Sequence, residues 1–181
     1  VRVDPDLIGD FQTKGARNLF SAFTELSINL LNGSGLFCFI VPQSVIGRDE
    51  TGVLRDFLFK QDCQLRFQIF DSVPDFLFDQ GKIESNTNTN INQRTTVLTL
   101  DKSKAKSIFT SPLLRWRRTE ERDLLFRSLK QVRIRQADLV DGAIPMLEGK
   151  EDLQAIRALS GVKAKISDAI GSDGRLLYIP K

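Results

Sequence analysis

Histidine is absent from this 181-residue sequence, and cysteine occurs only twice. Without histidine the chain cannot build a histidine-based catalytic triad, and it lacks both the commonest general base and a frequent transition-metal ligand. Cys38 and Cys63 are too few and too far apart for a disulfide framework or a zinc site. We therefore expect a reducing, cytoplasmic setting, and we predict that Cys38 is buried because it lies in an apolar segment.

Long hydrophobic runs are also absent, since no apolar stretch approaches the length needed to cross a bilayer. The opening residues, VRVDPDLIGDF, contain acidic side chains and lack the apolar core of a signal peptide. We expect no membrane partner. Because the chain starts with valine and enters a loop-like segment at once, we expect a fragment whose partner is the remainder of a parent chain or a separate subunit.

Charge is distributed unevenly along the chain. Residues 1–101 contain 9 basic and 13 acidic side chains, whereas residues 102–181 contain 17 basic and 10 acidic ones. The segment from Lys102 to Arg135 alone has 11 basic residues against 3 acidic ones. This pattern indicates either an anionic partner for the second part of the chain or a solvated basic helix face.

The segment Leu26–Ser44, LSINLLNGSGLFCFIVPQS, indicates the fold class. Its periodicity predicts that a helix over Asn18–Leu31 ends at Asn32 and leads into an apolar strand over Leu36–Val41. A strand that is apolar on both faces needs cover on both faces, which is typical of a parallel sheet in an α/β protein. Such sheets build their sites at the carboxyl ends of the strands, here Pro42–Ser44.

The elements that follow continue an α/β pattern. The first two strands are joined by a helix, so we expect them to run parallel through a right-handed crossover. The third strand has no helix before it, so an antiparallel insertion is possible. The expected elements are a helix over Asp49–Lys60 with Val53, Leu54, Phe57 and Leu58 inward, a strand over Gln64–Asp71, a long excursion over Ser72–Thr95 and a strand over Thr96–Leu100.

Beyond Leu100 the pattern is less regular. We divide the chain into a first unit, residues 1–101, and a basic α+β linker region, residues 102–181. The elements expected in the second unit are a connector or edge strand around Ser107–Phe109, a helix over Thr119–Gln131, a short strand or exposed edge over Val132–Arg135, a helix over Gly149–Leu159 and a strand over Leu176–Ile179.

Three sequence patterns occur in a specific order. They are Asn18-Leu19-Phe20-x-x-Phe23-x-Glu25, then Gly33-x-Gly35 followed by Phe39-Ile40-Val41-Pro42-x-Ser44, and then Leu54-Arg55-Asp56-Phe57-Leu58. Their order and spacing resemble the latter half of the catalytic domain of N6-adenine DNA methyltransferases, in particular the type IIG and type I restriction–modification enzymes. The resemblance covers Asn18 to Leu100 and includes Gln93–Leu98. Two departures are Ser34 between the glycines and the long excursion at Gly81–Asn92.

The resemblance implies part of a Rossmann-like, S-adenosylmethionine-dependent methyltransferase sheet, mixed in direction, with an antiparallel last strand. Such enzymes transfer a methyl group from S-adenosylmethionine to the amine of an adenine that must first leave the DNA stack. In the family, the residue at the Phe23 position packs against the adenine of the cofactor. An aromatic residue at the position of Phe78 or Phe76 stacks on the flipped base. The alternative for all three is an ordinary role in the core or as a loop anchor.

The chain lacks the family's principal chemical motifs. It contains no glycine-rich cofactor loop before a helix, and no Asn-Pro-Pro-aromatic motif to hold the target amine. The resemblance implies that this motif lies just upstream of Val1. We therefore expect no catalytic residue in this chain, S-adenosylmethionine binding only in the intact parent, and an inactive isolated fragment.

The basic segment corresponds to the start of the family's target-recognition region. The resemblance implies double-stranded DNA as the partner, with phosphate contacts from Arg115, Arg117, Arg118 and Arg122. Two alternatives remain open from the sequence. One is a non-catalytic α/β module, derived from a methyltransferase fold, that binds DNA or assists assembly. The other is a methyltransferase that acts on RNA or protein.

Overall fold

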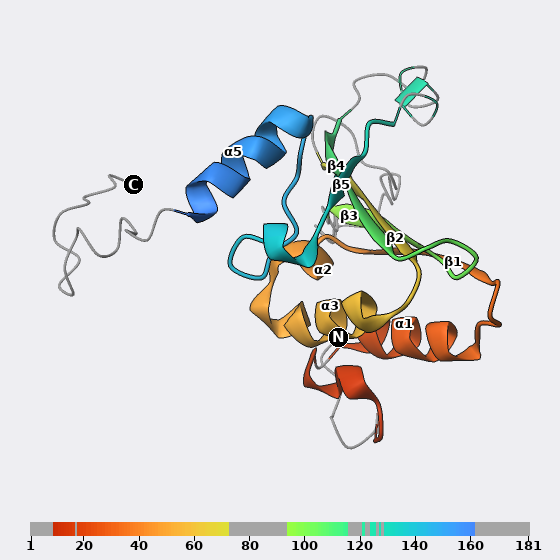
Figure 1. Cartoon of the computed structure of the whole chain (residues 1–181). Helices are drawn as coiled ribbons and strands as arrows, with labels where there is room; N and C mark the ends of the chain where they lie inside the picture. Colours follow the sequence, from red (N-terminus) through yellow and green to blue (C-terminus); the bar gives the residue numbers. More distant parts are fainter. Residues whose placement is uncertain are drawn as a thin grey trace, which may run out of the picture.

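The computed structural model describes residues 9–16, 18–72, 94–115, 121, 124–125, 127 and 129–161. These residues form an α/β fold, with helices packed against a five-stranded mixed sheet (Figure 1). The main elements are α1 (Leu19–Leu30), β1 (Leu36–Pro42), α2 (Ser44–Gly47), α3 (Gly52–Lys60), β2 (Gln64–Phe70), β3 (Thr95–Asp101), β4 (Ser107–Leu114), β5 (Val132–Ile134) and α5 (Lys150–Ser160). Three short 3-10 helices occupy Gln12–Ala16, Asp49–Thr51 and Gln136–Asp138.

Helix α1 has polar partners at both ends, and the predicted helix is confirmed. Asn18 is the N-cap, and its side-chain oxygen accepts a hydrogen bond from the Ser21 amide at 3.1 Å. At the other end, Lys102 Nζ donates to the carbonyls of Ile28 and Leu31 at 3.0 and 2.9 Å. A cation at this position adds hydrogen bonds to carbonyls at the end of the helix and interacts favourably with the helix dipole.

The sheet has the strand order β1-β3-β2-β4-β5. Strand β3 pairs antiparallel with both β1 and β2, while β4 pairs parallel with β2. The first two strands therefore run in the same direction, as predicted, but β3 lies between them. The predicted possibility of an antiparallel insertion is confirmed, because β3 runs opposite to both of its neighbours.

The hydrophobic core lies between one face of the sheet and helices α1, α2 and α3 (Figure 1). Strand β2 contributes the buried side chains of Leu65, Phe67 and Ile69, which alternate with half-buried polar residues. This alternation is typical of a sheet whose two faces have different environments. The α3 residues in this core are Leu54, Phe57, Leu58 and Phe59.

Strand β1 is not buried on both faces, so this prediction was wrong. Phe37 and Val41 are buried, but Leu36 and Ile40 are 64% and 51% exposed, and Cys38 is exposed. The reason is that the helices pack on one face of the sheet and leave the other face of β1 open, and the position of β1 at the sheet edge adds to this exposure. Two smaller expectations fail similarly: Cys38 is not in the core, and Val53 in α3 is 39% exposed.

The sheet continues beyond residue 101. Strand β4 is an interior strand rather than an edge, because β5 pairs with its other side. Strand β5 is the predicted short edge strand, and α5 confirms the helix predicted over Gly149–Leu159. The predicted strand at Leu176–Ile179 lies outside the described residues. Of the helix predicted over Thr119–Gln131, the described residues Glu121, Leu124, Leu125 and Arg127 are helical, whereas residues 129–131 are not.

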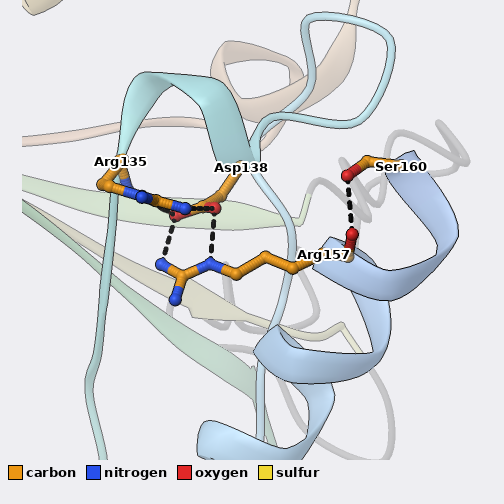
Figure 2. Close-up of polar contacts among 4 residues, drawn as sticks. All are labelled: Arg135, Asp138, Arg157 and Ser160. Atoms are coloured by element: carbon orange, nitrogen blue, oxygen red, sulfur yellow. Dashed lines mark hydrogen bonds and ion pairs between the residues drawn. The ribbon is translucent and has the colours of Figure 1, made fainter.

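Helix α5 is attached to the rest of the molecule through a buried carboxylate. Figure 2 shows Asp138 between two arginines. Arg157 Nε and one terminal amino group donate to its two oxygens at 2.7 and 2.8 Å, and the Arg135 amide donates at 2.7 Å. The hydrogen bond from Arg157, despite burial and together with Arg135, holds the pKa of Asp138 well below its ordinary value.

Replacing Asp138 with alanine is expected to release α5 from the sheet. Hydrogen exchange of the α5 amides should accelerate about tenfold, because a bidentate charge-assisted contact is lost. Acid should weaken the same contact: it stabilises the fold fully above the ordinary aspartate pKa of about 3.9, and this contribution is lost progressively as the pH falls from there to the much lower pKa of the folded state. Exchange rates of α5 that are equal in both proteins would contradict this role.

Candidate functional site

An open hollow of about 840 Å³ lies where β1 and β2 end and β3 begins. Its lining comes from segments that are distant in sequence but meet at the carboxyl ends of the two co-directional strands. The lining residues are Asn18, Gln43, Ser44, Ile46, Gly47, Arg48, Glu50, Thr51, Ser72, Arg94 and Met146. This is the edge at which sites are built in α/β sheets, and the residues after Pro42 contribute to it.

Arg55 of α3 holds the backbone beside this hollow through several hydrogen bonds. Its side chain is buried, and the residue is 4% exposed. Its guanidinium donates to the carbonyls of Gly142, Arg48 and Val45 at 2.9, 2.9 and 3.2 Å. It also donates to Thr51 Oγ1 at 3.0 Å. Burial lowers the pKa of Arg55, although Asp56 and Asp49 oppose this shift.

Arg55 thus ties three chain segments together, because carbonyl oxygens from α2, from the turn after it and from a distant loop share one side chain. Helix α2 is only four residues long, and short helices gain little stability from their own hydrogen bonds. The position of α2, which provides Ser44, Ile46 and Gly47 to the hollow, therefore depends on Arg55.

A second polar cluster adjoins the hollow at the end of β2. The buried carboxylate of Asp71 is 2.9 Å from Arg94 Nε and 2.6 Å from Arg115 Nε. It also accepts a hydrogen bond from the Ser72 amide at 2.8 Å. Burial by itself would raise the pKa of Asp71, but the Ser72 amide and the two guanidiniums together hold the pKa of this carboxyl below its ordinary value.

An apolar surface lies on α1 and β1, away from the core. Leu19, Phe23, Leu26 and Leu30 are all exposed, between 39% and 77%, and recur at intervals of three or four residues. Residues with this spacing share one side of a helix. The β1 side chains of Leu36, Cys38 and Ile40 are also exposed, and we refer to the two sets of exposed residues together as the α1–β1 apolar surface.

Two of the site residues that the sequence singles out, Phe23 and Arg115, lie in the described part of the chain. Phe23 lies on the α1–β1 apolar surface and does not line the hollow. Arg115 is held by Asp71 at the end of β4. The remaining predicted site residues, Phe76, Phe78, Arg117, Arg118 and Arg122, lie outside the described residues.

Sequence reasoning missed Asp71 and Arg94 as site residues. A signal was present, because each lies at the boundary of a predicted strand, at the end where sites are built. Their proximity was not visible, because it depends on β3 pairing directly with β2.

Comparison with known proteins adds little to this description. No protein-family model matches the chain, and no curated protein matches it. A solved structure described as "cryoEM structure DrdV-DNA complex" is similar over 64% of this chain, with 18% identity and a TM-score of 0.48. The chain spans only 12% of the length of that protein. In the described part of the chain, no helix combines the length and apolar character needed to cross a membrane.

Proposed function

We propose that this chain is part of a DNA adenine-N6 methyltransferase of a restriction–modification system. In the intact parent, such an enzyme transfers a methyl group from S-adenosylmethionine to a flipped adenine. The observation that supports this proposal is the arrangement of β1, β3 and β2, in which an antiparallel strand lies between two co-directional strands. An antiparallel last strand is what the sequence resemblance implies for this part of the methyltransferase sheet.

The α1–β1 apolar surface also supports the proposal. A long edge strand with no charged residue, beside an apolar helix stripe, requires cover in a stable soluble protein. We assign this cover to the preceding half of the same methyltransferase domain, which would add a strand to β1 and pack a helix against α1. The polar hollow would then lie near the middle of the row of strand ends in the completed sheet.

S-adenosylmethionine fits this chain only as one wall of a site. The ring of Phe23 is 54% exposed on α1, so it can pack against a flat apolar group such as an adenine ring. When bound in the parent, the cofactor supplies the methyl group. This chain contributes the apolar wall and the polar hollow, while the glycine-rich loop and the acceptor motif would come from the other half of the domain.

The proposal is tested by expressing the longer reading frame that contains this chain and measuring transfer of a labelled methyl group to DNA. We expect N6-methyladenine in duplex DNA from the parent, an Asn-Pro-Pro-aromatic motif upstream of Val1, and no transfer by the 181-residue chain. A start codon directly before Val1, or a parent that modifies RNA or protein instead, would contradict it. DNA binding without methyl transfer by the parent would favour a non-catalytic DNA-binding module.

A further inference from the structure

We infer that Asp71, Arg94 and Arg115 form a binding site for a phosphate of the DNA backbone, with the two arginines as donors and Asp71 as the residue that positions them. The assignment of DNA as the ligand rests on the proposed function. We refer to Arg94 and Arg115 as the arginine pair.

The sheet register places the three residues in one row. Phe70 of β2 is paired with Thr95 of β3 and with Leu114 of β4. Asp71 follows Phe70 in the chain. At the same level of the sheet, Arg94 precedes Thr95 on the antiparallel strand and Arg115 follows Leu114 on the parallel strand. The amide of Asp71 also donates to the Leu114 carbonyl at 3.0 Å, which continues the pairing past the end of the strand. Backbone pairing therefore determines the separation of the two arginines.

Burial differs sharply within the row. The Asp71 side chain is 2% exposed, whereas those of Arg94 and Arg115 are 52% and 62% exposed. Both arginines make their close contact with Asp71 through Nε, and none of the hydrogen bonds and ion pairs found among the described residues involves their terminal amino groups. Two guanidiniums and one carboxylate carry a net charge of +1, so an anion is favoured at this position.

The chemistry of arginine suits a phosphate ligand. A planar guanidinium donates two parallel hydrogen bonds to phosphate oxygens, and fixing its direction in advance reduces the entropy lost on binding. The buried Asp71 carboxylate needs cationic partners, as Asp138 does, but these contacts leave both guanidiniums half exposed to solvent, where a phosphate can reach them. Arg94 and Ser72 also line the hollow, which places a bound phosphate at its rim.

The test is binding of the full 181-residue chain to a short fluorescein-labelled DNA duplex, measured by fluorescence anisotropy over a series of salt concentrations. Arg94→Gln and Arg115→Gln should each weaken binding about tenfold and reduce the salt dependence by the equivalent of about one phosphate contact. Lys60→Gln is the matched control, because it removes one exposed positive charge near the amino end of β2, at the opposite end of the sheet. It should leave the salt dependence unchanged.

Asp71→Asn separates positioning from simple charge. If only net charge mattered, loss of this carboxylate would tighten DNA binding, because the protein becomes more positive. If Asp71 positions the arginines, the same substitution should weaken binding although it removes a negative charge. Arg94→Lys and Arg115→Lys, which keep the charge but lose the planar fork, should bind with intermediate affinity, and thermal unfolding of each variant verifies that it is folded.

The inference is overturned if the wild-type chain does not bind the duplex, if folded Asp71→Asn binds more tightly, or if the two glutamine variants behave like Lys60→Gln. These outcomes are independent of methyl transfer by the parent. If these variants overturn the phosphate site but the parent transfers methyl groups to DNA, the proposed function stands. If the arginine pair binds DNA in a salt-dependent way but the parent transfers no methyl group, the phosphate site stands and the methyltransferase assignment is wrong.

Discussion

Replacement of both Leu30 and Ile40 with lysine is expected to abolish methyl transfer by the proposed parent enzyme while leaving the isolated chain folded. Leu30 is 77% and Ile40 51% exposed, so in the isolated chain both lysines would be solvated and self-association should decrease. In the parent, the proposed cover would bury two unpaired charges, at a cost of several kcal/mol each. Sedimentation of the isolated chain and methyl transfer by the parent measure the two effects.

The matched control for this double variant is Leu159→Lys. Leu159 is 67% exposed on α5, so the substitution adds a similar charge to an exposed leucine away from the α1–β1 apolar surface. It should change neither self-association nor methyl transfer. A parent carrying lysine at positions 30 and 40 that methylates DNA like the wild type would show that nothing covers this surface.

Replacement of Arg55 with methionine is expected to reduce the free energy of unfolding by about 3 kcal/mol. Methionine fills much of the volume of the arginine stem but leaves three carbonyls and the Thr51 hydroxyl without this donor. Urea denaturation measures the loss. Hydrogen exchange at α2 should also accelerate, since α2 depends on these contacts for its position beside the hollow.

Arg48→Met is the control for this prediction. Arg48 is exposed and follows α2 directly, and Arg55 binds its backbone carbonyl, so the substitution removes the same charge without removing the buried donor. An Arg55 variant as stable as the Arg48 variant would show that the backbone carbonyls are satisfied without the guanidinium.

Two polar residues in the sequence patterns of the resemblance have structural roles here. Arg55 binds the backbone around α2, as described above. Glu25, buried in α1, accepts hydrogen bonds from the amides of Gln12 and Thr13 at 3.0 and 2.8 Å and thereby holds the short 3-10 helix against α1. Such buried polar residues stabilise one arrangement of the chain, because any other arrangement leaves their hydrogen bonds unmade.

Most helices and strands of the described region could be predicted because their signals are local, but α2 and the continuation of β4 to Leu114 were not predicted. Asn18 caps α1 within four residues, and alternation along β2 identifies its buried face within seven residues. The carboxyl end of β1 as the place of a site also followed from sequence, since the apolar strand and the polar residues after it are contiguous. The role of Arg115 could be expected only as part of a basic segment.

The sequence by itself determined the α/β class, the helix and strand positions, and the uneven distribution of charge, because these depend on periodicity, capping residues and composition. Only the tertiary structure decided that β3 lies between β1 and β2, that β1 is an open edge with an exposed face, and that Asp71 meets Arg94 and Arg115. The physical reason is that strand pairing joins residues far apart in the chain. Burial of a strand face likewise depends on what packs against it. A local sequence pattern predicts neither the pairing of distant strands nor the packing on their faces.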